Sequence, residues 1–342
     1  MSISVTGLTK AFGSERAVDN VSFEVAENEF FAIVGPSGCG KSTLLRLLAG
    51  LEEPTSGTIH LNGREVAGPK GNLPPEDRKT GFVFQSYALW PHLTVQGNVA
   101  FPAEAQGASR SEATKVARAN LETVALLDLA DRKPEALSGG QRQRVALARC
   151  LAGGAQVVLM DEPLANLDPH LRTTMERELA RFHRRAGTTT VYITHDQREA
   201  MALADRMAVM QSGRFLQVGT PSDIFDRPET ETVARFIGRG TILTAPYADG
   251  HVHLLDQAVR VSALKDHATG PAKVLFRPDD IKLGNPGGLN ATVKEAHYRG
   301  GAWEGSAQVE SLSAPFEVTS RTPLREGDKV GVTVTGGWVL PG

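Results

Sequence analysis

A glycine-rich segment followed by a lysine and two hydroxyl side chains is the first feature of this sequence that could do chemistry. It runs Gly-Pro-Ser-Gly-Cys-Gly-Lys-Ser-Thr from Gly35 to Thr43. Glycines let successive backbone N–H groups point into one concavity, and the N-terminus of a following helix adds positive potential. Lys41 could reach the β- and γ-phosphates of a nucleotide, and the Ser42 hydroxyl could bind magnesium. The alternative is a glycine-rich turn that only caps a helix.

Two adjacent carboxylates follow a short apolar run. Residues 157–160 predict a strand buried on both faces, and Asp161 and Glu162 come directly after it. Neighbouring side chains diverge at the end of a strand, so the two carboxylates can serve different tasks. Asp161 is placed to hold magnesium, and Glu162 is then free to act as a general base towards water. A solvated acidic turn is the alternative.

A third polar segment, Leu-Ser-Gly-Gly-Gln at 137–141, precedes this strand. Its Ser-Gly-Gly turn opens a helical run, which creates a second anion site with no lysine of its own. Taken alone, the segment would be an ordinary helix cap. Its position shortly before Asp161 favours a functional role.

The elements that must position these groups are those of a parallel α/β sheet. Continuous apolar runs at 30–34, 157–160 and 190–194 are typical of buried strands, and helical patterns lie between them. Strands interleaved with helices favour parallel pairing. Ahead of these runs, alternating apolar residues at 3–25 predict antiparallel strands around a turn.

The pattern changes near Gly238. Beyond it, short alternating segments separated by Gly and Pro predict a small all-β domain. We therefore divide the chain into an α/β domain at 1–238 and a β-rich domain at 239–342. The first contains a predominantly helical subdomain at about 86–152.

The composition limits the class of protein. The 342 residues include 37 basic and 39 acidic side chains, so there is no basic excess for a phosphate backbone, and we expect no nucleic-acid partner. The two cysteines, Cys39 and Cys150, lie far apart, which predicts neither a disulfide framework nor a structural zinc site. No secretory signal or membrane-length apolar run is visible, so a soluble cytoplasmic protein is expected.

Taken together and in this order, the motifs resemble the ATP-binding cassette (ABC) family, specifically the ATPase subunit of an ABC importer, over residues 3–238. The resemblance implies ATP and Mg²⁺ as cofactors and ATP hydrolysis as the reaction. It likens residues 35–43 to the Walker A loop, 161–162 to the end of Walker B and 137–141 to the LSGGQ signature. Four further positions resemble family motifs: Gln85 the Q-loop, Leu167-Asp168 the D-loop, His195 the switch histidine and Phe12 the aromatic that stacks on adenine.

The family's functional residues carry over to these positions. The implied catalytic residues are Glu162, His195 and Gln85, and the implied magnesium ligands are Ser42, Gln85 and Asp161. The implied nucleotide contacts are Phe12, Gly35, Ser37, Gly38, Cys39, Gly40, Lys41, Ser42, Thr43, Ser138, Gly139, Gly140, Gln141 and Asp168.

The resemblance also implies partners. In the family, two cassettes pack head to tail, with ATP held between the Walker A loop of one chain and the signature of the other. It therefore implies a homodimer that drives two transmembrane permease subunits at the cytoplasmic face of the cell membrane. A periplasmic or extracellular solute-binding protein would act indirectly. Tyr87 and Trp90, in the aromatic stretch after Gln85, are either a docking surface for the permease or ordinary core.

The β-rich domain adds a second, shorter resemblance. Arg-Pro-Asp-Asp at 277–280 resembles a motif of the OB-like regulatory domains attached to importer ATPases for sugars, polyamines, sulfate and ferric ion. Phe-Ile-Gly-Arg-Gly at 236–240 favours ferric ion as the cargo. Polyamine, phosphonate, sulfate and sugar cargoes stay open, and a cassette ATPase without a transport role is the other class of function.

Overall fold

The computed structural model describes residues 1–165, 167–264, 268–284 and 288–341, and the chain divides into two compact units, 1–221 and 222–342. This division lies earlier than the boundary that we predicted after residue 238. Helices α7 (Pro221–Asp226) and α8 (Glu231–Phe236) account for the difference. The buried Arg277 guanidinium donates to the carbonyls of Phe225 (2.8 Å) and Ala234 (3.4 Å), which ties both helices to the β-rich unit.

The centre of the first unit is a six-stranded sheet with the order β11-β10-β3-β9-β8-β7. Its strands are β3 (Phe30–Val34), β7 (Thr80–Val83), β8 (Val157–Asp161), β9 (Thr189–Thr194), β10 (Arg206–Gln211) and β11 (Arg214–Gly219). All neighbours are parallel except β11 at the edge. The predicted parallel sheet is therefore confirmed. Because parallel strands end at one edge of a sheet, the segments that follow β3, β7, β8 and β9 meet there.

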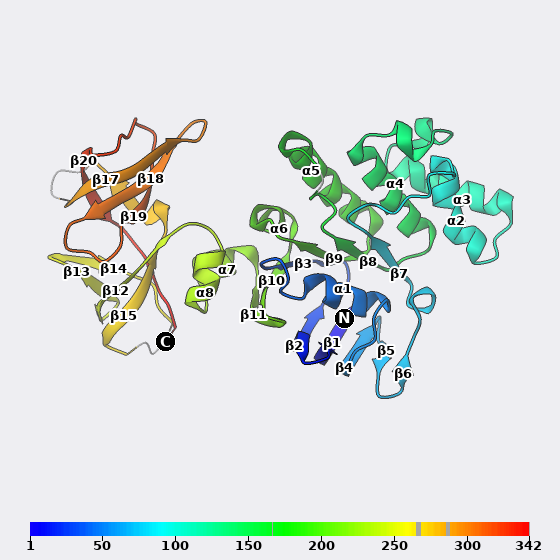
Figure 1. Ribbon diagram of the computed structural model, residues 1–342, viewed down its shortest axis with the longest axis horizontal. Helices are drawn as coiled ribbons and strands as arrows, with labels where there is room; N and C mark the ends of the chain where they lie inside the picture. The colour runs from blue at the N-terminus through cyan, green and yellow to red at the C-terminus, as the bar shows by residue number, and fades with distance from the viewer. Residues whose placement is uncertain (166, 265–267, 285–287, 342) are drawn as a thin grey trace. The chain divides into compact units, whose positions relative to one another are not determined.

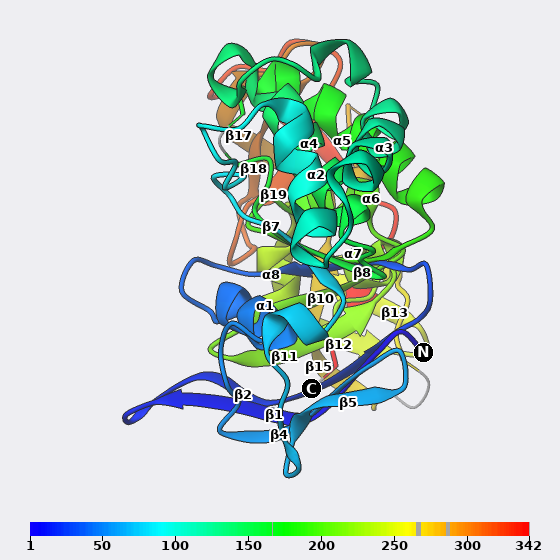
Figure 2. The same ribbon diagram turned by 90° about the vertical axis from the view of Figure 1, so that its right-hand side faces the viewer.

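A second, antiparallel sheet in this unit has the order β2-β1-β4-β5-β6. Its strands are β1 (Ile3–Phe12), β2 (Glu15–Val25), β4 (Ser56–Leu61), β5 (Arg64–Gly68) and β6 (Gly71–Asn72). Helix α1 (Lys41–Ala49) lies between the two sheets, and Figure 2 shows it above β1 and β4. Its fully buried Leu44, Leu45, Leu47 and Leu48 join the apolar faces of both sheets in one core. This core fixes the position of α1, the helix that directly follows the glycine-rich loop.

The C-terminal end of α1 is held by a buried arginine. Nη1 of Arg78 donates to the carbonyls of Leu47 (2.7 Å) and Leu48 (3.0 Å), and Nε donates to that of Leu73 (2.9 Å). The Leu47 and Leu48 carbonyls belong to the last turn of the helix, where carbonyls lack intrahelical donors, although Leu47 also accepts from the Gly50 N–H at 3.3 Å. Burial lowers the pKa of Arg78 to about 10, so the side chain is still charged at neutral pH.

We expect Arg78→Met to lower the free energy of unfolding by about 2–4 kcal/mol, because it removes the hydrogen bonds that the buried guanidinium makes to the carbonyls of Leu47, Leu48 and Leu73. Urea denaturation followed by circular dichroism measures the change. The control is Arg46→Met in the last turn of the same helix, where the arginine is exposed. Equal stabilities of the two variants would show that Arg78 does not hold the helix end.

In the first unit, α-helices connect β7 to β8, β8 to β9 and β9 to β10 (Figure 1). They are α2 (Val95–Ala105), α3 (Arg110–Thr123), α4 (Gly139–Ala152), α5 (Pro169–Ala186) and α6 (Gln197–Leu203). Helix α4 begins with a capping box, in which the Ser138 hydroxyl accepts from Gln141 N and the Gln141 side chain accepts from Ser138 N. None of the helices in the described part of the chain is both long and apolar enough to span a membrane.

The second unit contains two five-stranded antiparallel sheets, in the orders β14-β13-β12-β15-β21 and β16-β20-β17-β18-β19. The strands of the first are β12 (Thr241–Ala248), β13 (His251–Leu254), β14 (Gln257–Arg260), β15 (Gly270–Phe276) and β21 (Trp338–Val339). Those of the second are β16 (Ile281–Leu283), β17 (Leu289–Tyr298), β18 (Trp303–Val309), β19 (Phe316–Ser320) and β20 (Lys329–Val334). Both contribute to one apolar core, in which Phe276 and Phe316 meet edge to face. The predicted OB-like β-domain is confirmed, with α7 and α8 added to it.

Candidate active site

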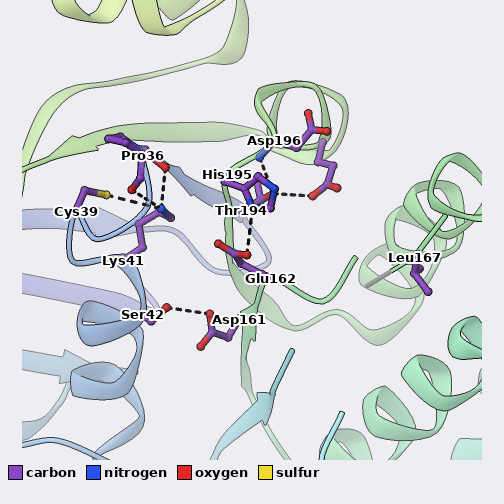
Figure 3. Close-up of polar contacts among 12 residues, drawn as sticks. Pro36, Cys39, Lys41, Ser42, Asp161, Glu162, Leu167, Thr194, His195 and Asp196 are labelled. Carbon is purple, nitrogen blue, oxygen red and sulfur yellow. Dashed lines mark hydrogen bonds and ion pairs between the residues drawn. The ribbon is translucent and has the colours of Figure 1, made fainter. Parts of the chain in front are cut away.

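The loop between β3 and α1 wraps around its own lysine. Nζ of Lys41 donates to the carbonyls of Gly35 (2.7 Å) and Pro36 (3.0 Å), and the side chain is 5% exposed (Figure 3). The Cys39 thiol is buried in the same loop, with Sγ 3.7 Å from Nζ. A cation is therefore enclosed by a loop of backbone groups, at the end of a strand that is buried throughout.

Two glycines of this loop are required by close backbone approaches. A Cβ on Gly35 would lie 2.1 Å from the Met210 carbonyl oxygen, and one on Gly40 would lie 2.0 Å from that of Ala17. Gly40 also has φ of +106° and is the N-cap of α1. A glycine cap has no side chain to accept from the first-turn amides, so these donors remain available to an anion.

The side chains after β3 and β8 meet as the parallel sheet predicts. The Ser42 hydroxyl donates to Oδ1 of Asp161 at 3.1 Å. Burial raises the pKa of the Asp161 carboxyl, and the neighbouring Glu162 adds to the effect. A hydroxyl and a carboxylate oxygen are hard ligands of the kind that Mg²⁺ prefers when nucleotide phosphates and water complete its octahedron. The donor set thus fits the expected magnesium ion.

Glu162, which follows β8, and His195, which follows the neighbouring β9, form a second polar pair. Glu162 has a left-handed backbone, with φ of +45°, and its N–H donates to the Ile193 carbonyl of β9 at 3.1 Å. His195 follows β9, and its Nδ1 donates to Oε2 of Glu162 at 3.1 Å. The imidazole is 54% exposed, so one ring edge faces the carboxylate while the rest is open to a ligand.

The signature segment contacts other parts of the chain. A Cβ on Gly139 would lie 2.8 Å from Leu167 Cδ2, and one on Gly140 would lie 2.7 Å from Met175 Sδ of α5. None of the contacts recorded among the described residues joins residues 138–141 to the glycine-rich loop. The Ser138 hydroxyl accepts as the helix cap, and its own hydrogen remains able to bind an anion.

The other expected site residues lie around these groups. Gln85 and Leu167 line one cavity of about 470 Å³ together with Gly139. Phe12 is 50% exposed at the end of β1, with the Lys10 ammonium 4.8 Å from its ring centroid. Thus Ser42 contacts Asp161 and Glu162 contacts His195, while Lys41 is held by its own loop and Gln85 lines a cavity beside the signature helix.

Arg149 is a buried arginine near the site that the sequence analysis did not single out. Its guanidinium is buried, donates to the carbonyls of Ala88 (2.7 Å) and Tyr87 (3.0 Å), and stacks over Trp90 at 5.1 Å. Tyr87 and Ala88 both have positive φ, of 63° and 45°. The Tyr87 hydroxyl in turn donates to the Pro163 carbonyl at 3.2 Å, next to Glu162. Arg149 lies one helical turn after the buried Val145, but the carbonyls that it binds are far away in the sequence.

Comparisons with known proteins identify the family. Residues 18–165 match the ABC transporter family. The chain is 39% identical to the sn-glycerol-3-phosphate import ATP-binding protein UgpC 1 of Rhizobium johnstonii, over 97% of this chain and 91% of that protein. It is 45% identical to the spermidine/putrescine import ATP-binding protein PotA of Pseudomonas aeruginosa, over 87% of this chain and 82% of that protein.

Solved structures agree with the sequence relatives. The dimeric post-hydrolysis structure of the ATP-binding cassette MJ0796, bound to ADP and Pi, superposes with a TM-score of 0.55 and 32% identity. The match covers 64% of this chain and 98% of that one. The glycine-rich loop and the Glu162–His195 pair described above agree with these similarities. The chain belongs to the ABC transporter family and is an ATP-binding, ATP-hydrolysing subunit of the importer type.

Proposed function

We propose that this chain hydrolyses ATP in a site built from the loop at 35–43 and the ends of β8 and β9. The contact that carries the proposal is the one between His195 Nδ1 and Glu162 Oε2. It directs a carboxylate towards the side of the site where a water could attack a γ-phosphate held by Lys41. Glu162 then accepts the proton of that water as general base, and His195 orients the carboxylate.

Magnesium would be held by Ser42 and Asp161, with Gln85 as the third protein ligand. When bound, this ion supplies positive charge to the β- and γ-phosphate oxygens. The Ser42–Asp161 hydrogen bond supports the assignment because it brings the two ligand oxygens to within 3.1 Å of each other. Lys41 would add a second positive charge to the phosphates. Phe12, exposed at the end of β1, is proposed to stack on adenine.

We further propose that the site is completed by a second copy of the chain, packed head to tail. Ser138, Gly139, Gly140 and Gln141 of one protomer would bind the ATP held by the loop of its partner, with Asp168 at the interface. Two observations support this arrangement. The signature contacts the D-loop and α5 of its own chain, and its helix N-terminus, capped by Ser138, has no lysine of its own. The related cassette MJ0796 is dimeric in its ADP- and Pi-bound structure.

The dimer can be tested with two serines that occupy equivalent positions. Ser138 and Ser109 are both exposed N-caps with a capping box, at α4 and α3. In a Glu162→Gln background, which slows hydrolysis, we expect Ser138→Phe to bind ATP normally but to stay monomeric in sedimentation, because the bulky ring blocks the partner's nucleotide. Ser109→Phe should still dimerise with ATP. If Ser138→Phe weakened ATP binding to the monomer instead, the signature would serve its own chain.

The motor is proposed to act on two membrane permease subunits, as a peripheral protein on the cytoplasmic face. The segment at about 86–152 is the proposed docking region. Trp90 is half-buried there between Phe101, at 4.3 Å between ring centroids, and Arg149. A solute-binding protein would deliver cargo to the permease, and the β-rich unit is proposed to be regulatory.

For the cargo, the relatives favour organic solutes over ferric ion. Our expectation of ferric ion came from residues 236–240, and neither relative described above has a name that supports it. We propose a polyamine as the cargo, because the spermidine/putrescine protein shares 45% identity over most of both chains. A phosphate ester is the second candidate, from the glycerol-3-phosphate relative. ATPase assays of the reconstituted transporter with each cargo and its binding protein distinguish them.

A further inference from the structure

A buried glutamate lies directly behind the histidine loop. Glu199, in the first turn of α6, is 3% exposed. Its Oε2 accepts two short hydrogen bonds, from the Tyr192 hydroxyl and from the Thr194 hydroxyl, both at 2.7 Å. Hydrogen bonds to a carboxylate are stronger than those between neutral groups, especially away from water. The buried Glu199 carboxylate therefore fixes the side chain of Thr194, the last residue of β9.

The Thr194 hydroxyl also reaches across His195. While it donates to Glu199, it accepts from the backbone N–H of Asp196 at 3.0 Å (Figure 3). Asp196 is then fixed as the N-cap of α6, where its Oδ1 accepts from Arg198 N at 2.8 Å. The backbone is held on both sides of His195. The direction in which the exposed imidazole leaves the chain is thus set by a buried hydroxyl.

An arginine of α5 extends this network to the D-loop. Nε of Arg172 lies 3.5 Å from Oε1 of Glu199, and Nη1 lies 3.4 Å from Oδ2 of Asp196. Nη2 donates to the Leu167 carbonyl at 3.3 Å. One guanidinium thus joins the carboxylates behind His195 to the segment that lines the cavity beside the signature helix.

We propose that Glu199, acting through Thr194, is the positioning residue that aims His195 at Glu162, and that Arg172 couples this aim to the D-loop. The inference rests on the proposed hydrolytic role of Glu162 and His195. Glu199 does not touch the reacting atoms. Its contribution is geometric, and a misplacement of a catalytic group by about 1 Å can reduce the rate by about 10²-fold.

The test compares three substitutions in the purified full-length chain, by steady-state kinetics of ATP hydrolysis. Thr194→Val is isosteric and removes both bonds of the hydroxyl. We expect it to lower kcat about 10- to 100-fold and to leave KM for ATP unchanged. Thr194→Ser restores the hydroxyl and should return kcat to within about threefold of the parent. Tyr192→Phe removes a bond of the same length to the same Glu199 oxygen, but has no bond to Asp196, and should keep kcat within about twofold.

The outcomes separate this inference from the proposed function. Parent-like kcat in Thr194→Val, or equal losses in Thr194→Val and Tyr192→Phe, would overturn the positioning role. If His195→Ala and Glu162→Gln also kept the parent kcat, the proposed hydrolytic site itself would be wrong. Should Thr194→Val fail to fold, Arg172→Met provides the measurement, with exposed Arg198→Met as its charge-matched control on α6. A kcat loss confined to Arg172→Met at constant KM supports the network, and equal values for both variants refute it.

Discussion

Replacing Glu162 by Gln is expected to lower the ATP turnover number by about 10²- to 10⁴-fold while ATP still binds. The amide has the shape of the carboxylate, and its oxygen can still accept from His195 Nδ1, so the loop geometry should survive. What is lost is the basic group that takes the proton of the attacking water. Phosphate release under saturating ATP measures the change.

The same variant should accumulate an ATP-bound dimer, because binding and hydrolysis are then separated. Sedimentation with and without ATP detects it. The matched control is Glu122→Gln, which removes a carboxylate from an exposed position of α3 and should keep the parent turnover. Parent-rate hydrolysis by the Glu162 variant would assign the base to another residue.

Replacing Lys41 by Met should weaken ATP binding roughly 10- to 100-fold, the equivalent of losing one hydrogen bond from a charged donor to a phosphate. Methionine keeps most of the length and packing of the side chain in a loop that buries it. The ammonium already has carbonyl partners, so the nucleotide must compete with the Gly35 and Pro36 oxygens for its hydrogens. Titration with a fluorescent ATP analogue gives the affinity.

Two controls distinguish a specific loss of ATP binding from a general effect of removing a charge or from unfolding of the variant. Lys115→Met removes an exposed ammonium from α3 and should leave the affinity unchanged. The thermal unfolding midpoint of Lys41→Met should stay near that of the parent. Unchanged ATP affinity in a folded Lys41 variant would contradict the phosphate role of this lysine.

The sequence predicted those parts of the candidate site that lie in short motifs directly after buried strands. The glycine-rich loop, the carboxylates after β8 and the histidine after β9 follow apolar runs that are visible without coordinates, and parallel pairing brings their ends together. The structure adds contacts such as Ser42–Asp161 and Glu162–His195 to this expectation. Their roles in catalysis remain predictions that the experiments above test.

What could not be predicted depends on partners far apart in the chain. Arg149 lies on a helix face with other arginines, and only the carbonyls of Tyr87 and Ala88 explain its burial. In the sequence, Glu199 is an ordinary charged residue after His195, and its burial is explained only by the Tyr192 and Thr194 hydroxyls that donate to it. Likewise, α7 and α8 continue the helical pattern of the first domain, yet the Arg277 guanidinium joins them to the second unit.

The arginine at the end of α1 has a thermodynamic consequence for the other end of that helix. Arg78 holds the last turn, both sheets clamp the leucines between them, and close backbone contacts surround Gly35 and Gly40. A nucleotide therefore meets a preorganised loop whose entropic cost of ordering was met when the chain folded. Because little of the binding free energy of the phosphates is needed to order the loop, that free energy can stabilise the proposed dimer.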